Sequence, residues 1–278
     1  MPAVPTVTLN NGVEIPQLGF GVFQIKPEDT VKATTSALEI GYRHIDTAQM
    51  YGNEREVGLA VRESGIPRED VFVTSKVNNN RLERDDMLRS FDTSLDDLGF
   101  DYLDLLLIHW PLPGVSDYVA RWKAMEEIYA SGRVKAIGVS NFHPNHLRNV
   151  FAGAEVRPAV NQIEVSPFLT QDELRAFDAE HQIVTEAWSP IARGKVADDP
   201  VIGRIAERLG RSPAQVTLRW HVQRGDVVFP KSVTRSRIEE NFAIFDFELD
   251  ESDMTAISAL NRDERTGPNP DEFNYIPG

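Results

Sequence analysis

Short apolar segments alternate with longer amphipathic segments along almost the whole chain. The apolar segments are rich in valine, isoleucine, leucine and aromatic residues and are too short for helices, a pattern typical of buried strands. They lie at residues 18–23, 44–48, 71–77, 102–110, 134–140, 159–165, 183–189 and 226–232. The pattern therefore predicts eight strands.

The stretches between the predicted strands have the periodicity of helices. Apolar residues recur at every third or fourth position, as on the buried face of an amphipathic helix. The clearest examples are residues 29–41, 53–65, 84–99 and 171–181. A glycine, which is common just beyond a helix C-terminus, closes several of the predicted helices. These glycines are Gly41, Gly65, Gly99 and Gly210.

The order of these elements predicts the fold. Alternating strands and helices imply parallel strands, and eight such units fit a (β/α)8 barrel, the TIM barrel fold of the α/β class. We expect a single domain over residues 1–278. Residues 6–9 and 13–16 flank an Asn-Asn-Gly turn, which favours a β-hairpin capping the bottom of the barrel. Residues 261–278 are polar and rich in proline and glycine, and we expect a tail loop there.

An open doubly wound sheet is the competing architecture. Its nucleotide-binding form usually has a Gly-x-Gly-x-x-Gly sequence after the first strand. Here Gly19 and Gly21 are followed by Gln24 at the place of the third glycine. The barrel is therefore favoured.

Composition narrows the functional classes. Hydrophobic residues make up 41% and charged residues 26% of the chain, as in ordinary globular proteins. The 29 Lys and Arg against 43 Asp and Glu give a formal charge of −14, which disfavours nucleic acid as a partner. The absence of cysteine excludes disulfides and thiolate chemistry. Neither a signal peptide nor a membrane-spanning segment is apparent, so we expect a soluble cytoplasmic protein without a membrane partner.

Four polar residues stand near the C-terminal ends of predicted strands, where barrel enzymes have their active sites. Asp46 and Tyr51 follow the second strand, Lys76 ends the third, and His109 ends the fourth. Singly, each has an ordinary structural explanation, such as a turn residue, a packed phenol or a buried histidine. Together they would converge on one mouth of the barrel.

These four side chains suit the delivery of a proton to a carbonyl oxygen while hydride reaches its carbon. A phenol with a pKa of about 10 is a weak acid at neutral pH. A lysine charge about 4 Å away would contribute roughly 4 kcal/mol, or about three pKa units before desolvation opposes it. We expect Lys76 to lower the pKa of Tyr51, Asp46 to hold Lys76, and His109 to be a second donor.

Longer motifs surround these residues. They are Gly-Tyr-Arg-His-Ile-Asp46-Thr-Ala, Tyr51-Gly-Asn-Glu, Thr-Ser-Lys76 and Leu-Ile-His109-Trp-Pro, with further motifs at residues 138–142, 160–164, 188–195 and 230–241. In order and spacing over nearly the whole chain, they resemble the aldo-keto reductases, NADPH-dependent reductases built on a (β/α)8 barrel. The branch that they resemble is the prokaryotic one that includes 2,5-diketo-D-gluconate reductases.

The resemblance implies a role for each matching position. Tyr51 would be the general acid, with Lys76, Asp46 and His109 completing a catalytic tetrad. The implied cofactor is NADPH, without a metal ion. Its binding residues would be Gly21, Val22, Ser140, Asn141, Gln162, Trp188, Ser189, Pro190, Ile191, Ala192, Lys231, Ser232, Val233, Arg237, Glu240 and Asn241.

The implied binding residues divide by the part of NADPH that they would contact. Ser140, Asn141 and Gln162 would hold the nicotinamide carboxamide, and Trp188 would stack on the ring. The pyrophosphate would be contacted by residues 189–192 with Lys231 and Ser232. The adenosine phosphate would meet Ser232, Val233 and Arg237, and adenine would lie near Glu240 and Asn241. A group of cations at a helix start suits a phosphate in so acidic a chain.

The expected substrate is a small carbonyl compound. We expect Phe23, Met50 and Trp110 to line its pocket, joined by Phe273 or Tyr275 from the tail; the alternative for the residues outside the tail is simple packing at the barrel rim. Such a pocket suits aldehydes, α-dicarbonyl compounds or keto sugars of moderate size, and the family default is a monomer.

Three positions depart from the family pattern. Asn78 stands where many relatives have an aromatic residue after the catalytic lysine, so we expect a more open or polar pocket wall. Ser166 replaces a common histidine, which we interpret as a packing change. Thr234 stands where a second basic residue is frequent.

Other chemistries remain alternatives. Glu164 and Glu186 are a carboxylate pair of the kind that glycosidases use. Lys76 at a strand end would also suit a Schiff base. His143 and His146 invite a metal site, although no supporting motif accompanies them. A cofactor-binding regulatory or redox-sensing subunit with little turnover is the alternative from a different class, because some members of the superfamily regulate membrane channels.

Overall fold

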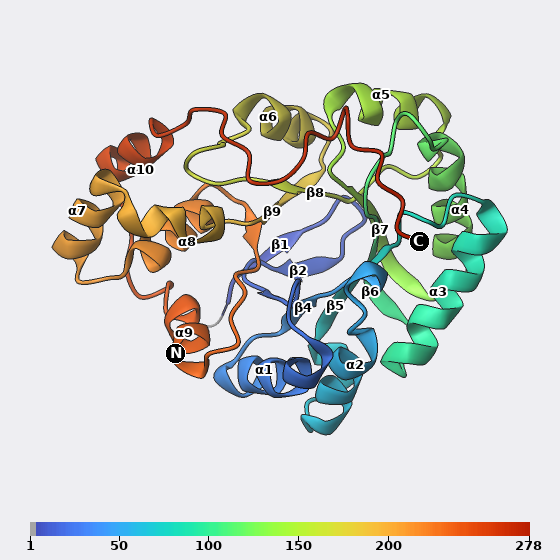
Figure 1. Cartoon of the computed structure of the whole chain (residues 1–278), viewed down its shortest axis with the longest axis horizontal. Helices are drawn as coiled ribbons and strands as arrows, with labels where there is room; N and C mark the ends of the chain where they lie inside the picture. The colour runs from blue at the N-terminus through green and yellow to red at the C-terminus, as the bar shows by residue number, and fades with distance from the viewer. Residues whose placement is uncertain (1–3) are drawn as a thin grey trace.

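A ring of eight parallel strands forms the centre of the computed structural model, which describes residues 4–278 (Figure 1). The strands are β3 (Phe20–Gly21), β4 (His44–Asp46), β5 (Phe72–Val77), β6 (Leu103–Ile108), β7 (Val134–Ser140), β8 (Val160–Glu164), β9 (Val184–Trp188) and β10 (Val227–Val228). Each strand pairs with the next one in chain order. The N–H of Gly19 donates to the Val228 carbonyl oxygen (2.8 Å), and the N–H of Val228 to that of Gln17 (3.0 Å). The first and last strands are thereby joined, and the sheet closes into a barrel.

Helices surround the ring of strands (Figure 1). In the described part of the chain they are α1 (Pro27–Ile40), α2 (Glu54–Glu63), α3 (Arg84–Leu98), α4 (Tyr118–Ala130), α5 (Pro144–Gly153), α6 (Asp172–Glu180), α7 (Pro200–Leu209), α8 (Pro213–Gln223), α9 (Arg235–Phe242) and α10 (Glu251–Ser258). The predicted (β/α)8 barrel is confirmed, with α10 added after its last helix. No helix among residues 4–278 is both long enough and apolar enough to cross a bilayer.

The predicted hairpin is present ahead of the barrel. Its strands are β1 (Thr6–Thr8) and β2 (Glu14–Pro16), which pair antiparallel. Leu9 and Ile15 are buried in one cluster with Phe72, the first residue of β5. The side chain of Asn10 donates to the carbonyl oxygen of Pro158, just before β8 (2.9 Å). The hairpin therefore covers the N-terminal end of the barrel, so that the C-terminal end is left for chemistry.

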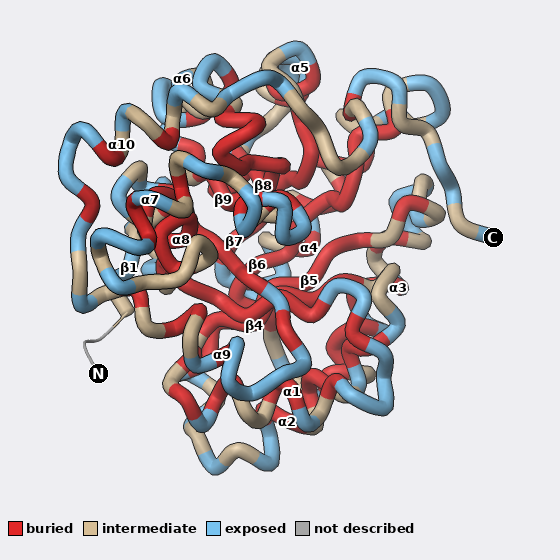
Figure 2. Tube along the Cα trace, turned by 60° about the vertical axis from the view of Figure 1, so that its left-hand side comes forward, coloured by how far each residue is buried: buried red, intermediate tan, exposed pale blue. Residues whose placement is uncertain are grey.

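The strands are the most deeply buried part of the molecule (Figure 2). Apolar side chains such as Leu105 and Leu107 fill the barrel next to the hairpin. Toward the C-terminal end polar residues follow, and Asp46, Gln162 and Glu186 are buried there. Because buried polar groups must find partners, this change of polarity marks the place of the site.

The tail loop after α10 contains no helix or strand in residues 261–278. In Figure 1 it runs from α10 past α6 and α5 and ends near α4. It therefore crosses one end of the barrel.

Candidate active site

The four predicted catalytic residues form one cluster at the C-terminal ends of β4, β5 and β6. The ammonium of Lys76 donates to both carboxylate oxygens of Asp46 (2.7 and 2.9 Å) and to the phenol oxygen of Tyr51 (3.2 Å). Its side chain is fully buried. The rings of Tyr51 and His109 lie edge to face with centroids 5.7 Å apart. The structure thus brings together residues from the ends of three strands and the segments that follow them, as expected for a barrel of this class.

Two residues outside the tetrad explain why Tyr51 occupies this place. Tyr51 ends a short 3-10 helix, Gln49–Tyr51, which follows β4. The side chain of Asn53 donates to the carbonyl oxygens of Val22 and Ile25 and accepts from Thr47. Glu54 accepts from Ser75 on β5 (2.5 Å). The Tyr-Gly-Asn-Glu motif therefore fastens the loop of Tyr51 to β5 and to the segment after β3.

Burial sets the protonation state of Tyr51 and Lys76. Desolvation raises the pKa of Tyr51, and the nearby Lys76 charge opposes it without cancelling it. Burial, the largest single effect, lowers the pKa of Lys76, but Asp46 and Tyr51 together outweigh it, so the pKa lies above its usual value. We predicted the direction of the lysine effect from the sequence, but the expected net lowering of the Tyr51 pKa is absent. Tyr51 keeps its proton at neutral pH and can donate it.

His109 is buried and uncharged. Desolvation, helped by the charges of Lys76 and Arg121, holds the pKa of His109 well below its ordinary value. Its Nδ1 has no hydrogen-bond partner among residues 4–278. A neutral imidazole has one N–H, so His109 can still be a hydrogen-bond donor to an oxygen beside Tyr51.

Arg121 is a buried charge that the sequence pattern did not reveal. It lies on α4, is 1% exposed, and donates to the carbonyl oxygen of Trp110 (3.0 Å). Because Arg121 stands within an ordinary amphipathic helix, nothing in the sequence indicates that its charge is buried.

The residues expected to hold the nicotinamide meet above the barrel interior. The side chain of Asn141 donates to the carbonyl oxygen of His109 (3.0 Å), and its oxygen accepts from the indole N–H of Trp188 (2.8 Å). The hydroxyl of Ser140 donates to the carbonyl oxygen of Gln162 (2.9 Å). Three strands, β7, β8 and β9, are tied to β6 by these contacts, which hold Trp188 beside the tetrad.

Two segments that the resemblance assigns to the cofactor have an unusual backbone. A Cβ added at Gly21 would lie 3.0 Å from the carbonyl oxygen of Phe229, so the segment of Gly21 and Val22 is packed tightly. After β9, Ser189, Ala192 and Arg193 all have left-handed φ angles, from 47° to 55°. Such conformations cost on the order of 1 kcal/mol each for residues with side chains and are concentrated at functional sites. Pro190 is buried and Ile191 is half-buried in the same turn.

Two cations near α9 are free for an anionic ligand. Lys231 and Arg237 are exposed, and neither forms an ion pair within the described residues, whereas Arg235 pairs with Glu39 and Glu239. Ser232 is 9% exposed beside the exposed Val233. This arrangement fits the phosphate groups expected there.

The two residues expected near adenine, Glu240 and Asn241, have different surroundings. Glu240 already accepts a hydrogen bond from the hydroxyl of Ser212, at the start of α8. Asn241 is 7% exposed. The carboxylate of Glu240 is therefore shared with a structural contact.

The predicted substrate residues lie around Tyr51. Phe23 is 50% exposed, and its ring centroid is 5.0 Å from that of Tyr51. Met50 is half-buried in the same 3-10 helix as Tyr51. Trp110 is buried and packs on Phe273 of the tail loop, with centroids 4.3 Å apart. The structure thus brings the tail to the substrate residues.

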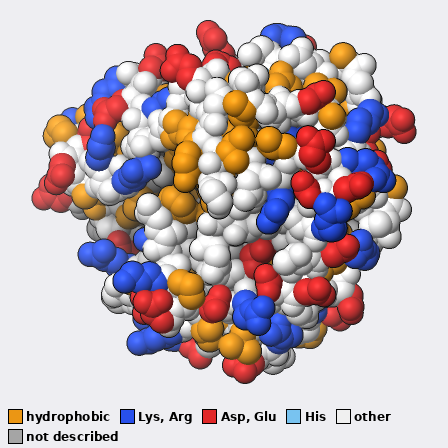
Figure 3. Space-filling model, turned by 45° about the vertical axis from the view of Figure 1, so that its right-hand side comes forward, with side chains coloured by type: hydrophobic (Ala, Val, Ile, Leu, Met, Phe, Trp, Pro, Cys, Tyr) orange, Lys and Arg blue, Asp and Glu red, His pale blue; other side chains and the backbone are white. Residues whose placement is uncertain are grey.

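Exposed hydrophobic side chains gather at the same end of the barrel. The large ones are Phe23, Val115, Val233, Tyr275 and Ile276, all in loops that follow barrel strands or in the tail loop. Figure 3 shows hydrophobic side chains near the middle of one face of the molecule, with charged side chains around them. Exposed apolar groups rimmed by polar ones are typical of binding sites.

Glu164 and Glu186 are engaged in the structure. Glu164, at the end of β8, accepts from the N–H and hydroxyl of Thr266 (2.5 and 2.6 Å) and from the N–H of Gly267 (3.1 Å). Glu186 lies fully buried inside the barrel. Neither carboxylate is placed for glycoside hydrolysis.

The two histidines that invited a metal reading also bind the tail. His143 Nδ1 and His146 Nε2 lie 2.8 and 3.3 Å from the carboxylate oxygens of Asp271. No group of metal-binding side chains occurs among residues 4–278. These tail contacts could not be predicted from the sequence, since the partners lie more than a hundred residues apart.

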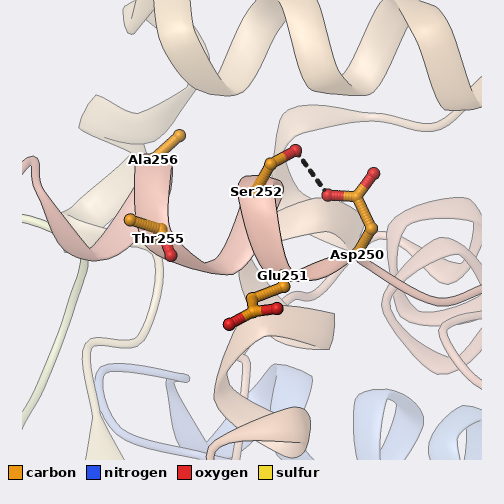
Figure 4. Close-up of a pocket in the computed structure, with 5 residues that line it drawn as sticks. All are labelled: Asp250, Glu251, Ser252, Thr255 and Ala256. Atoms are coloured by element: carbon orange, nitrogen blue, oxygen red, sulfur yellow. Dashed lines mark hydrogen bonds between the residues drawn. The ribbon is translucent and has the colours of Figure 1, made fainter.

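A shallow hollow lies at the first turns of α10, outside the barrel (Figure 4). Its lining residues are Asp250, Glu251, Ser252, Thr255 and Ala256. The hydroxyl of Ser252 donates to Asp250 (2.6 Å). Asp250 is also the N-cap of α10 and accepts from the N–H of Asp253 (2.9 Å), so these residues form the start of a helix and the hollow adds no chemistry.

Comparison with known proteins gives the family. The profile of the Aldo/keto reductase family matches residues 17–262. An aldo-keto reductase of Mycolicibacterium smegmatis is 50% identical over 271 residues, 98% of each chain. Glyoxal reductase of Bacillus subtilis is 49% identical over 271 residues, 97% of this chain and 98% of its own. Among solved structures, a mutant of Gox0644 in complex with NADPH has a TM-score of 0.95 at 41% identity, covering 99% of this chain and 100% of its own.

Fold, family and an NADPH-bound neighbour agree that the protein is an oxidoreductase of the barrel class. It belongs to the Aldo/keto reductase family and is an enzyme that uses NADPH to reduce carbonyl groups. The predictions of family, fold, enzyme class and cofactor are thus confirmed. Reductases similar over almost their whole length favour the enzyme over a regulatory subunit.

Proposed function

We propose that this enzyme reduces small aldehydes and α-dicarbonyl compounds, with Tyr51 as the general acid. The observation that carries the proposal is the contact between Lys76 and Tyr51. Because Lys76 donates to the phenol oxygen, the phenol hydrogen is free for another acceptor. Among residues 4–278 no hydrogen bond takes up that hydrogen, so a substrate oxygen can receive it.

The proton and the charges balance in this reaction. When bound, NADPH would supply a hydride to the carbonyl carbon and become NADP+. Tyr51 gives its proton to the carbonyl oxygen, so the product is an alcohol and the phenolate remains beside the ammonium of Lys76. Asp46, held in two hydrogen bonds, keeps that ammonium in place. His109, as a neutral donor, would stabilise the same oxygen.

The residues that would hold NADPH fit the cofactor in kind and position. Lys231 and Arg237 supply unpaired positive charge for its phosphates. The absence of a side chain at Gly21 lets the backbone of Phe229 pack against it, and Trp188, anchored through Asn141, offers a flat surface for the nicotinamide. The cofactor would therefore bring its nicotinamide to the tetrad.

A compact substrate suits the pocket. Phe23, Met50, Trp110 and Phe273 would border Tyr51 with apolar surface. The similarity to a glyoxal reductase supports an α-dicarbonyl substrate. We also propose that the chain is a single domain and acts as a monomer.

Substitution of the phenol tests the acid. Tyr51→Phe keeps the ring and removes the hydroxyl, so kcat for a panel of aldehydes and dicarbonyls should fall at least about 100-fold. NADPH affinity, measured by fluorescence titration, should change less than severalfold. Lys76→Met should cause a similar loss, and the double variant should be about as slow as either single one, because the two residues act as a unit.

A matched control is Tyr118→Phe, which removes a hydroxyl bonded to Asn149 on the outer helices. Its kcat should equal that of the wild type. Near-full turnover by Tyr51→Phe would exclude the phenol as acid and make His109 the leading donor.

A further inference from the structure

Glu186 is a buried acid that the proposed chemistry does not use. It lies in β9, and Gln162 is its partner in register on β8. The side-chain nitrogen of Gln162 donates to Glu186 Oε2 (2.9 Å) and to Asp46 Oδ2 (2.8 Å). Both hydrogens of the Gln162 amide are therefore committed to carboxyl groups inside the barrel.

These two contacts fix the orientation of the Gln162 amide. A flipped amide would turn its oxygen toward Asp46, whose carboxylate can only accept hydrogen bonds. In the observed orientation the Gln162 oxygen accepts no hydrogen bond from the described residues. It is the polar atom that Gln162 has left for a ligand beside Ser140 and Trp188.

The surroundings of Glu186 keep it uncharged. Burial, reinforced by the negative charge of Asp46, raises the pKa of Glu186 to about 8, against the opposing effects of Gln162 and Lys76. A neutral acid can accept from Gln162 without competing with Asp46 for the ammonium of Lys76. The cluster can thus hold Gln162 and leave the catalytic ion pair intact.

We propose that Glu186 is a positioning residue for the cofactor: together with Asp46 it holds the Gln162 side chain so that its oxygen accepts from the carboxamide N–H of NADPH. Glu186 itself touches neither cofactor nor substrate. The inference rests on the proposed place of Gln162 in the cofactor site.

A cofactor analogue separates this role from general stability. In the 3-acetylpyridine analogue of NADPH a methyl group replaces the carboxamide nitrogen, so no N–H faces Gln162. Binding of each cofactor is measured by quenching of tryptophan fluorescence. Wild type should bind NADPH about fivefold more tightly than the analogue, as expected for one neutral hydrogen bond. Glu186→Met should abolish this preference by weakening NADPH alone, whereas Glu186→Gln, which mimics the neutral acid, should retain it.

The control is Thr185→Val, on the opposite face of β9, where the hydroxyl contacts Asp178 (3.4 Å). It should keep the preference. Loss of the preference in Gln162→Met but not in Glu186→Met would overturn the inference and leave the proposed cofactor site standing. A wild type without preference, or a Gln162→Met variant that keeps it, would instead contradict the place of Gln162.

A measurement on folded wild type covers the case in which Glu186→Met does not fold. The side-chain amide signals of Gln162 in NMR spectra, assigned by their absence in Gln162→Met, should shift as Glu186 titrates at alkaline pH. Asp46 and Lys76 are the other charged groups that face this cluster, and the shift should vanish in Glu186→Gln. A pH-dependent shift that persists in Glu186→Gln, or none in wild type, would overturn the inference.

Discussion

Burial decides the charge of the ionisable side chains inside this barrel. It is the largest cause of the raised pKa of Tyr51 and Glu186 and of the lowered pKa of His109. Lys76 behaves differently, because Asp46 and Tyr51 together outweigh desolvation. At the active site the Lys76–Asp46 ion pair therefore lies among groups that stay neutral at pH 7, and a neutral phenol beside an ammonium is suited to donate a proton.

His44 shows the same effect away from the active site, and its consequence for stability can be measured. It is fully buried at the start of β4, and desolvation lowers its pKa to about 4 from an ordinary value of 6.5. Below pH 6.5 the unfolded chain binds a proton that the folded chain refuses, so stability falls as the pH falls toward 4. The loss should approach about 3 kcal/mol.

The measurement compares wild type with His44→Gln by denaturant unfolding at pH 7 and pH 4. Glutamine can replace the contacts of His44 with Pro16 and Thr74 but cannot titrate. The free energy of unfolding should therefore drop by about 3 kcal/mol more in wild type than in the variant. Equal drops in both proteins would show that His44 accepts a proton in the fold.

The clustering of the candidate site residues could be predicted from the sequence, but their charge states could not. Asp46, Lys76 and His109 stand at the ends of strands that the hydrophobic pattern marks, and parallel strands bring such ends together. Desolvation, in contrast, depends on side chains from distant parts of the chain. For this reason the predicted net shift of the Tyr51 pKa was wrong, although the predicted effect of Lys76 on it was right.

At the scale of elements, the tail loop is fastened to the barrel at several points. Glu164 holds Thr266 and Gly267, Asn274 accepts from the N–H of Gly114 (2.7 Å), and Asn79 donates to the carbonyl oxygen of Tyr275 (3.0 Å). Strands and helices were predictable because their periodicity is local. The path of the tail was not, because contacts across a hundred residues or more leave no periodic signal.

Removal of the outer tail should change the substrate pocket and spare the cofactor site. A chain ending at Gly267 keeps the contacts of Glu164 and loses Phe273, whose ring covers Trp110. Loss of one buried aromatic contact of about 1 to 2 kcal/mol corresponds to roughly 5- to 30-fold. We expect KM for carbonyl substrates to rise by this factor, with NADPH affinity nearly unchanged.

Steady-state kinetics with several aldehydes and a fluorescence titration with NADPH distinguish the outcomes. Gly114→Ala is not a suitable control, because its added carbon would meet Asn274. Ile276→Ser, which changes an exposed side chain near the chain end, keeps the aromatic contact and should leave KM within about twofold. An unfolded truncated chain, or one that no longer binds NADPH, would show that the tail is structural.

At the scale of the whole molecule, closure of the barrel joins the two ends of the chain. The hydrogen bonds of Gln17 and Gly19 with Val228 connect the first strand to the last. The number of predicted strands was sufficient to anticipate this closure, since eight parallel strands with helical connections have few other arrangements. The proposed cofactor residues, from Gly21 to Asn241, lie around this closed ring.

The closed ring leads to a prediction for thermal unfolding with cofactor. If the chain is one cooperative domain, NADPH at a hundredfold excess over its Kd should stabilise the whole fold by about 2.7 kcal/mol. With an unfolding entropy of about 2 cal/mol/K per residue, a chain of this size should show a single transition displaced upward by about 5 °C.

The same measurement tests Arg237. With NADPH and NADH at one fixed concentration, the displacement that NADPH gives in Arg237→Ala should shrink toward that given by NADH, because a charge-assisted bond to the extra phosphate is lost. Arg235→Ala, which removes the neighbouring paired cation, should keep the difference between the two cofactors. Two calorimetric transitions with only one of them displaced would show that cofactor binding stabilises only part of the chain, contrary to a single cooperative domain.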